Sequence, residues 1–244
     1  DAALEVTASP NANSVVVAVG GDGTMLEAMR VAQRVKAHVI GINMGNVGFL
    51  TELSANDRIQ LLLDLQNVFK SRPHSGNVEQ RWFIHADAGD WQATSGNEVS
   101  VAGEKSDEMI RYRLLIDGAD AGVHRANSIL VSTPTGSSAY SMSAGGALMV
   151  PNMRAMQIVP VAPFSLTSRP IIVSGSSVIQ IEAWGARIAV RSDGTERYVA
   201  DRVHTEEDPC LVTIGLSSDP VNVLHTPRWN YFNVLAEKLG WIKE

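Results

Sequence analysis

Short apolar runs alternate with helical periods in the first part of the chain. Val15–Val19 is a β-branched run without polar alternation, which is typical of a strand buried on both faces of a parallel sheet. A second short strand is predicted at Val39–Ile42. Between them, one helical face carries the apolar residues Met25, Ala28, Met29, Ala32 and Val35. A second helix is predicted at residues 56–69, with the inward-facing residues Ile59, Leu62 and Leu63. This strand–helix–strand–helix order indicates an α/β unit.

After Pro73 the pattern changes to short strands separated by turns. The predicted strands are Trp82–Ala86, Arg111–Asp117, Ser128–Ser132, Ile171–Val173, Val178–Trp184, Ile188–Arg191, Leu211–Gly215 and Val221–Leu224. Asp117-Gly118 and Asp193-Gly194 are dipeptides typical of tight hairpin turns. Helical periods remain at about Ala139–Ala147 and at Tyr231–Leu239. The apolar face of the last helix is expected to consist of Phe232, Leu235, Ala236 and Leu239.

We therefore expect an α/β N-terminal domain plus a β-rich C-terminal domain. The first domain is placed at residues 1–75 and the β-rich domain at residues 76–229. The C-terminal helix, within residues 230–244, is expected to dock back on the first domain. A chain of 244 residues is long enough for two such domains with hydrophobic cores of their own.

Composition narrows the class of protein. The 20 Lys and Arg residues against 26 Asp and Glu residues give a net charge of −6, which argues against a general nucleic-acid binder. Cys210 is the single cysteine, so an intrachain disulfide is excluded and a reducing compartment is favoured. No apolar run approaches the roughly 18–20 residues of a membrane span. We expect a cytoplasmic protein without a membrane or nucleic-acid partner.

The glycine-rich loop that follows the first strand is the sharpest local signal. Gly20-Gly21-Asp22-Gly23-Thr24 stands between a predicted buried strand and a helix start, where backbone amides can approach phosphate oxygens. The charge of Asp22 repels phosphate, so its use would be proton acceptance or metal coordination. Alternatively, Asp22 is only the N-cap of the helix. A Walker lysine is absent, and Leu26 occupies the place of the third glycine of a dinucleotide fingerprint.

A second cluster is rich in hydroxyl groups. Thr133–Ser141 follows a predicted strand and suits either a polar ligand or an ordinary loop, and it contains no GxSxG nucleophile elbow. Asn97-Glu98 precedes another apolar stretch and carries little information alone. The histidines show no HExxH or other metal-ligand spacing, so no protein-held metal site is predicted.

Together these motifs resemble the NAD kinase family, most closely its bacterial members. The resemblance rests on the order and spacing of Gly20–Thr24, Gly45-x-x-Gly48-Phe49-Leu50, Asn97-Glu98 and Thr133–Tyr140, and it extends over about residues 14–242. A loop like Gly20–Thr24 also occurs in phosphofructokinases and in diacylglycerol-type lipid kinases. The Asn-Glu pair and the TPTGSSAY sequence make the resemblance specific.

The resemblance implies that ATP phosphorylates NAD, bound in a crevice between the two domains, usually in a homodimer or homotetramer. Asp22 would accept the proton of the adenosine ribose 2′-hydroxyl, and a divalent cation such as Mg²⁺ would neutralise the transferred phosphate. The residues expected to bind the substrates are Gly21, Gly23, Phe49, Asn97, Glu98, Arg125, Asn127, Ser138, Ala139, Tyr140, Ser143 and Thr195.

Three positions depart from the family pattern. Asn127 stands where the family usually has an aspartate, Phe164 where a histidine is expected, and Thr195 where many members have a glutamine. The first two motivate an alternative, an NAD(P)(H)-binding protein with little kinase activity. A lipid kinase that shares the glycine-rich loop is a third hypothesis.

Overall fold

The computed structural model describes residues 14–45, 48–55, 58–70, 78–105 and 107–240. The chain divides into two compact units. The first unit comprises residues up to 81, residues 150–152 and residues from 219 onward, and the second comprises residues 82–149 and 153–218. No helix in these described ranges is long and apolar enough to cross a membrane.

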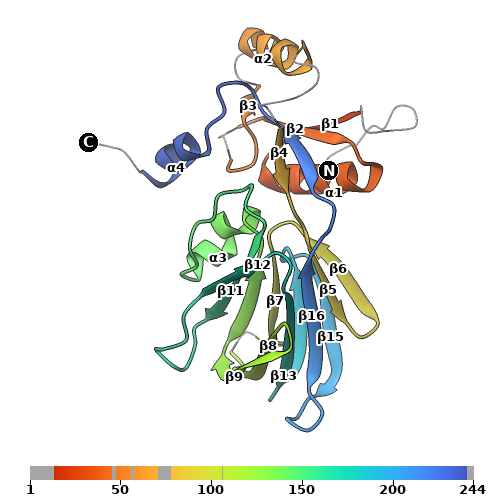
Figure 1. Ribbon diagram of the computed structural model, residues 1–244, viewed down its shortest axis with the longest axis vertical. Coiled ribbons are helices and arrows are strands. Elements are labelled where there is room, and N and C mark those ends of the chain that lie inside the picture. Colours follow the sequence, from red (N-terminus) through yellow and green to blue (C-terminus); the bar gives the residue numbers. More distant parts are fainter. Residues whose placement is uncertain (1–13, 46–47, 56–57, 71–77, 106, 241–244) are drawn as a thin grey trace. The chain divides into compact units, whose positions relative to one another are not determined.

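The first unit is built on a five-stranded sheet (Figure 1). Its strands are β1 (Val15–Val19), β2 (His38–Asn43), β3 (Leu53–Ser54), β4 (Val78–Arg81) and β17 (Val221–Leu224). β1, β3 and β17 run parallel to β2, and β4 is antiparallel to β17. β1 pairs in parallel with β2, as its apolar run predicts. The predicted burial of β1 on both faces is wrong, because Val17 and Val19 lie on one face of the strand and are 42% and 52% exposed.

Helix α1 (Asp22–Val35) connects β1 to β2 and packs through the predicted face. Met25, Ala28, Met29 and Ala32 are buried, while Val35 is half-buried. The helix ends where Lys36 adopts a left-handed conformation, with a φ of 56°. The helical face predicted from the sequence to be apolar is therefore the face that is buried in the structure.

The inward face predicted for the second helix is wrong. In α2 (Arg58–Lys70), Ile59, Leu62 and Leu63 are exposed. Leu61, Leu65 and Val68 instead pack on the core of the unit, a spacing that places them on the same helical face. The sequence pattern did not indicate this face as the buried one, because the face also holds the charged residue Asp64. Arg228 donates hydrogen bonds to both Asp64 oxygens, at 2.6 and 2.9 Å, which makes burial of this carboxylate tolerable.

The last helix, α4 (Tyr231–Leu239), has the predicted bounds and belongs to the first unit. Asn230 caps it by accepting a hydrogen bond from the backbone N–H of Phe232, at 2.9 Å. Its buried residues are Tyr231, Val234 and Leu235. Phe232, which we expected on the inward face, is exposed, because the helix contacts its unit about one residue out of phase with the expected face.

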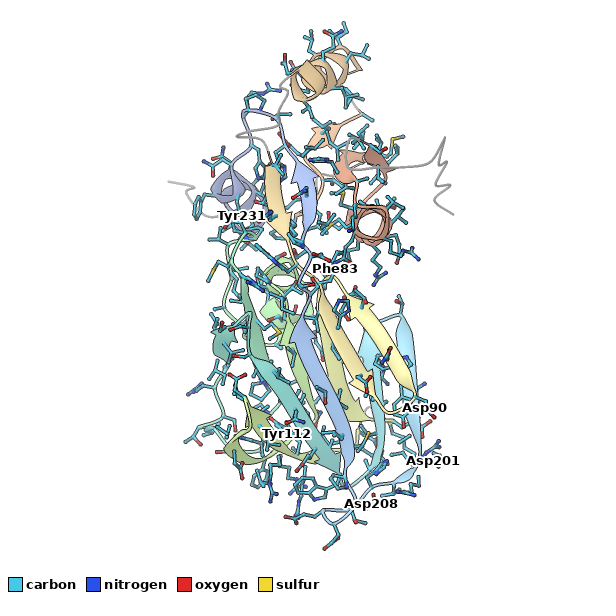
Figure 2. The ribbon with its side chains drawn as sticks, turned by 45° about the vertical axis from the view of Figure 1, so that its right-hand side comes forward. Phe83, Asp90, Tyr112, Asp201, Asp208 and Tyr231 are labelled. Atoms are coloured by element: carbon cyan, nitrogen blue, oxygen red, sulfur yellow. The ribbon has the colours of Figure 1, made fainter. Side chains whose placement is uncertain are left out.

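The second unit is a β-sandwich of two six-stranded antiparallel sheets (Figures 1 and 2). One sheet has the order β12-β11-β10-β7-β14-β15 and the other β6-β5-β16-β13-β8-β9. The strands are β5 (Ile84–Ala88), β6 (Trp91–Ser95), β7 (Glu98–Gly103), β8 (Ile110–Ile116), β9 (Ala119–Ala126), β10 (Ser128–Ser132), β11 (Ala155–Val161), β12 (Ile171–Ser174), β13 (Val178–Trp184), β14 (Arg187–Ser192), β15 (Glu196–Val203) and β16 (Cys210–Leu216). Side chains from both sheets form one buried core between them.

Both predicted hairpin dipeptides form tight turns. Asp117 and Gly118 join β8 to β9, and Asp193 and Gly194 lie in the turn from β14 to β15. All four residues have positive φ angles, as turns that match the strand twist require. The helical period expected at Ala139–Ala147 is shorter in the structure, where a 3₁₀ turn at Thr135–Ser138 precedes the single-turn helix α3 (Tyr140–Ser143).

The two units do not follow the ranges expected from the sequence. β4 and the predicted strand Val221–Leu224, which is β17, both fall within residues 76–229 yet pair in the sheet of the first unit. The chain therefore returns to its first sheet after completing the sandwich. Local hydrophobicity identifies such a strand but carries no information on which sheet it joins.

Candidate active site

The glycine-rich loop places Asp22 in the first turn of α1. Gly21 is the N-cap residue and Asp22 makes no capping bond, so the N-cap interpretation of this aspartate is wrong. Its two oxygens instead accept hydrogen bonds from the backbone N–H groups of Phe49, at 2.9 Å, and Leu50, at 3.0 Å. Two motifs separated by about 25 residues are thus joined at one carboxylate.

Gly48 leaves the room that this carboxylate needs. A Cβ atom at position 48 would lie 1.8 Å from Asp22 Oδ1 and 2.4 Å from its Cγ, far inside van der Waals contact. At Gly21 and Gly23 the situation is the reverse, because a Cβ there would meet no atom within 4 Å. Both glycines are exposed beside the N-terminus of α1, where backbone amides and the helix dipole favour anions.

In the second unit, Asp193 shapes the turn that carries Asn97 and Glu98. Its carboxylate accepts three backbone hydrogen bonds, from Gly96, Asn97 and Glu98, at 2.8, 2.8 and 3.0 Å. The Asp193-Gly194 dipeptide indicates only a hairpin turn. Its spacing from residue 96 along the chain gave no sign of this second function.

The hydroxyl-rich motif holds the same turn from another side. Thr133 donates its backbone N–H to the Asn97 carbonyl oxygen, at 2.9 Å, and its hydroxyl to the Gly96 carbonyl oxygen, at 2.6 Å. A Cβ at Gly136 would lie 2.1 Å from the Asn97 carbonyl oxygen, so only glycine permits this approach. The TPTG and Asn-Glu motifs are therefore parts of one compact structure.

Glu98 is a buried acid of this cluster, and its pKa is raised by its surroundings. The side chain is 7% exposed, and its Oε2 has no hydrogen-bond partner among the described residues. Burial, and then the neighbouring charge of Asp193, raise its pKa from the ordinary value of 4.5 to about 7. A buried carboxyl with a free oxygen is suited to accept hydrogen bonds from a ligand's hydroxyl groups.

Replacing Glu98 with glutamine is expected to change how stability depends on pH. Folding raises this pKa, so the folded chain binds the proton more tightly, and the free energy of unfolding falls as pH rises from about 4.5 through about 7. Above pH 7, the free energy of unfolding of Glu98→Gln should therefore exceed that of the parent by up to about 3 kcal/mol. Near pH 4 the two proteins should have the same free energy of unfolding. Urea unfolding at both pH values measures this. The exposed Glu207→Gln is the control, and a pH-independent difference would contradict the prediction.

Four further predicted residues lie around the 3₁₀ turn and α3. Ser138 and Ala139 are half-buried, whereas Tyr140 and Ser143 are exposed. The neighbouring Ser137 is buried and bonded to the backbone of residues 134 and 149, so the turn is internally fixed. Thr195 is exposed in the hairpin that also carries Asp193. These side chains belong to the same unit as Asn97 and Glu98.

Arg125 and Asn127 lie elsewhere in the second unit. Ser132, at the end of β10, pairs with Glu98, whereas Ser128, at its beginning, pairs with Ala102. At about 3.3 Å per strand residue, Asn127 is therefore about 16 Å from the Glu98 end. The structure does not bring these two predicted residues together with the others in one chain. Gly21, Asp22, Gly23 and Phe49 lie in the first unit.

Comparison with known proteins gives matches in both parts of the chain. Residues 5–68 match the family model of the ATP-NAD kinase N-terminal domain, and residues 96–205 match that of the ATP-NAD kinase C-terminal domain. The fold and the two motif clusters thus belong to one class of proteins, the ATP-NAD kinases. This result confirms the expected α/β N-terminal domain plus β-rich C-terminal domain.

Individual relatives lead to the same family. The chain is 37% identical to an NAD kinase of Erwinia tasmaniensis over 240 residues and 35% identical to one of Klebsiella pneumoniae over 235 residues. Each comparison covers 94% of this chain and 77% of the relative. The chain belongs to the NAD kinase family, which favours the NAD kinase interpretation over the lipid-kinase alternative.

Solved structures share the fold. An NAD kinase from Archaeoglobus fulgidus, in complex with ATP, has a TM-score of 0.74 at 28% identity, covering 98% of this chain and 89% of that one. Yeast NADH kinase, complexed with NADH, has a TM-score of 0.76 at 23% identity, covering 95% of this chain and 67% of the yeast chain. The second likeness concerns the fold alone.

Proposed function

We propose that this protein transfers the γ-phosphoryl group of ATP to the 2′-hydroxyl of the adenosine ribose of NAD, giving NADP and ADP. The observation that carries the proposal is the carboxylate of Asp22, held at the N-terminus of α1 by the amides of Phe49 and Leu50. Membership of the NAD kinase family supports it. So does the ATP bound to the Archaeoglobus relative.

Asp22 is the proposed proton acceptor. As the ribose oxygen forms its bond to the γ-phosphorus, Asp22 takes the hydroxyl proton, and the bond from the γ-phosphorus to the bridging oxygen of ADP breaks. ADP leaves with that electron pair. The two backbone N–H groups fix the carboxylate's direction, and such positioning is the main contribution that proteins make to phosphoryl transfer.

The exposed glycines beside Asp22 are the proposed contact for the ATP phosphates. Gly21 and Gly23 leave their backbone accessible at the positive end of the α1 dipole. The described residues contain no group of three or more His, Cys, Asp or Glu side chains that could hold a metal ion. Mg²⁺ commonly binds through substrate phosphates and few protein groups, so we propose that it enters as part of the ATP substrate.

The cluster around Glu98 is the proposed site for the adenosine half of NAD. The unpartnered oxygen of Glu98 offers an acceptor for ribose hydroxyls, and Asn97 lies beside it in the turn fixed by Asp193. We assign the remaining contacts to the residues that the family resemblance implies: Phe49, Ser138, Ala139, Tyr140, Ser143 and Thr195.

Arg125 and Asn127 enter this proposal through an assembly. They lie at the opposite end of β10 from Glu98, so we propose a homodimer or homotetramer in which they meet the nicotinamide half of a dinucleotide bound by another copy. Light scattering of the purified protein tests the assembly. The cytoplasmic location that the single, buried Cys210 favours is part of the same proposal.

An assay of NADP formation from NAD and ATP, with and without Mg²⁺, tests the proposed reaction. The alternative, a binding protein with little activity, predicts dinucleotide affinity without turnover. It is favoured by Asn127, an amide where the family has a carboxylate, and by Phe164, whose ring is 72% exposed where the family has a histidine. Turnover that depends on ATP would exclude it.

Tyr140→Ala is expected to raise the KM for NAD several-fold and to leave the KM for ATP nearly unchanged. The ring is 46% exposed and free to stack on the dinucleotide, so its loss should also leave the melting temperature within a degree or two. Steady-state kinetics and a thermal melt measure both effects. Tyr140→Phe keeps the ring and should behave like the parent. A fall in kcat at unchanged KM would contradict a binding role.

A further inference from the structure

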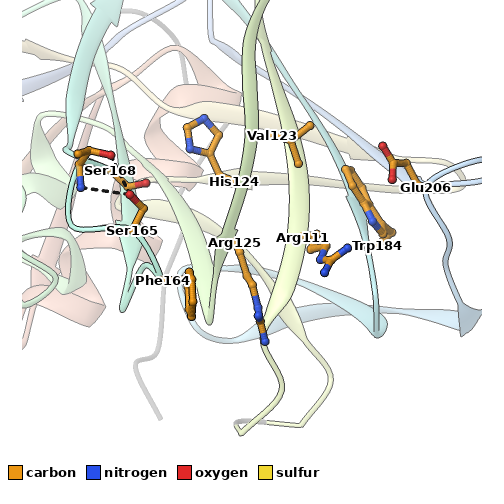
Figure 3. Close-up of a pocket in the computed structure, with 10 residues that line it drawn as sticks. Arg111, Val123, His124, Arg125, Phe164, Ser165, Ser168, Trp184 and Glu206 are labelled. Carbon is orange, nitrogen blue, oxygen red and sulfur yellow. Dashed lines mark hydrogen bonds between the residues drawn. The ribbon is translucent and has the colours of Figure 1, made fainter.

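A buried polar cluster in the first unit has no part in the assignments made above. It consists of Glu52, which comes just before β3, and of His225 and Thr226, which directly follow β17. Both residues after β17 are buried, and the side chain of Glu52 is 17% exposed. The cluster is separate from the open pocket in the second unit, whose Arg125 belongs to the proposed substrate contacts (Figure 3).

The turn after β17 holds the carboxylate of Glu52. Thr226 donates its backbone N–H to Glu52 Oε2, at 3.0 Å, and its hydroxyl to Glu52 Oε1. The Nδ1 atom of His225 lies 3.1 Å from Glu52 Oε2. Hydrogen bonds to a carboxylate are stronger than those between neutral groups. Residue 52 is thereby fixed to a part of the chain that lies 174 residues further along the sequence.

His225 is itself held from its other side. Its ring stacks on that of Trp229, with the centroids 4.2 Å apart, and its Nε2 atom lies 3.5 Å from Glu79 Oε1. Arg81 donates a hydrogen bond to the same oxygen, at 2.7 Å. Burial raises the pKa of Glu79, but His225 and Arg81 outweigh it and lower this pKa from the ordinary value of 4.5 to about 2. The imidazole therefore has contacts on both sides that keep it against Glu52.

Glu52 belongs to the segment that directs the carboxylate of Asp22. The donor amides are those of Phe49 and Leu50, and Leu50 comes only two residues before Glu52. Between them, Thr51 is 1% exposed and its hydroxyl accepts a hydrogen bond from β2. Two residues span at most about 7 Å, so a displacement of Glu52 would reach the donor amides directly.

The sheet of the first unit explains why these distant residues meet. β1 and β17 both run parallel to β2, so their carboxyl ends lie at the same edge of the sheet. Asp22 comes shortly after β1 and Thr226 shortly after β17. The segment of residues 48–52 contacts both of them, through its amides at one end and through Glu52 at the other.

We propose that Glu52 and Thr226 are positioning residues for the phosphoryl transfer. Through Glu52, Thr226 holds the segment whose amides set the direction of the Asp22 carboxylate. The inference rests on the proposed function, in which Asp22 accepts the ribose proton. Neither positioning residue is assigned to a substrate, so a change at either one should lower kcat and leave the KM values nearly unchanged.

Amide hydrogen exchange of Phe49 and Leu50 in the full chain tests the anchoring without turnover. Thr226→Val removes the hydroxyl and keeps the shape, and we expect it to speed the exchange of both amides by about tenfold. Thr226→Ser keeps the hydroxyl and should exchange like the parent. Arg228→Gln is the matched control, because it removes the ion pair that joins the same turn to α2 and leaves the bonds of Thr226 in place. Its two amides should also exchange like those of the parent.

Steady-state kinetics measures the consequence for the reaction. Thr226→Val should lower kcat about tenfold, while the KM values for NAD and ATP stay within about twofold. Glu52→Gln should show the same split between kcat and KM. Thr226→Ser should recover most of kcat, and Arg228→Gln should keep the kcat of the parent even if its melting temperature falls. Combined with Asp22→Asn, Thr226→Val should lower kcat no further, because no base is left to position.

The outcomes separate this inference from the proposed function. Unchanged exchange of Phe49 and Leu50 in Thr226→Val would overturn the inference. Equal losses of kcat in Thr226→Val and Arg228→Gln would also overturn it, since the contribution of Thr226 would then be to stability alone. So would a loss from Thr226→Val that persists in full beside Asp22→Asn. A parent that forms no NADP would instead refute the proposed function, and the exchange rates would still decide whether Thr226 anchors the segment.

Discussion

Asp22→Asn is expected to lower kcat by about 10²–10⁴-fold, the usual contribution of a general base. The dissociation constant for NAD should stay within a few-fold, because the amide keeps the shape of the carboxylate and can still accept a hydrogen bond from one of the two amides of Phe49 and Leu50. Steady-state kinetics with ATP and NAD give the first quantity, and calorimetric titration with NAD gives the second.

A neighbouring acid on the same helix is the control for this substitution. Glu27 is exposed on α1 and pairs with Arg30, so Glu27→Gln should leave kcat unchanged. Activity of Asp22→Asn close to that of the parent would show that Asp22 is not the proton acceptor. The carboxylate would then serve only to hold the segment that contains Phe49 and Leu50.

Gly48→Ala is expected to lower kcat by about 10²-fold or more, although residue 48 bears no reactive group. The added methyl would stand 1.8 Å from Asp22 Oδ1, so either the carboxylate or the segment around Phe49 must move. A displacement of about 1 Å at a reacting group can cost about 10²-fold in rate. The KM for NAD should change much less than kcat.

Gly45→Ala is the matched control for the glycine substitution. A Cβ at position 45 would meet its nearest atom, Asn43 Oδ1, only at 3.9 Å, so this variant should keep the activity of the parent. Thermal melts of both variants show whether the fold is retained. Equal activity of Gly48→Ala and the parent would contradict the positioning of Asp22 by this segment.

The sequence predicted those elements whose pattern decides their structure locally. The amphipathic period of α1 and the Asp-Gly turns have the predicted form, and β1 is a strand as predicted, although only one of its faces is buried. The strands that were not predicted are β3, β4, β6, β7, β9, β11 and β15. Of these, β9 and β15 are edge strands with many polar residues, so they lack the apolar alternation on which the prediction depends. β11 is apolar and buried, so polarity does not explain why it was missed.

The sequence pattern did not predict which strands and side chains pair when they lie far apart in the chain. The run that forms β17 reads as any short strand, and only the folded chain reveals that it inserts between β2 and β4. The same limit applies to Asp193, whose three backbone partners lie nearly a hundred residues earlier. Motif resemblance grouped Arg125 and Asn127 with Glu98, whereas strand register places them at the other end of β10.

The turn fixed by Asp193 has a consequence for the thermodynamics of ligand binding. Loops that must become ordered around a ligand lose conformational entropy at about 1–2 kcal/mol for each backbone residue. Residues 96–98 are held by hydrogen bonds to the side chains of Asp193 and Thr133. A dinucleotide that meets Glu98 would encounter a backbone of low entropy, so little of its interaction energy would be consumed in ordering this turn.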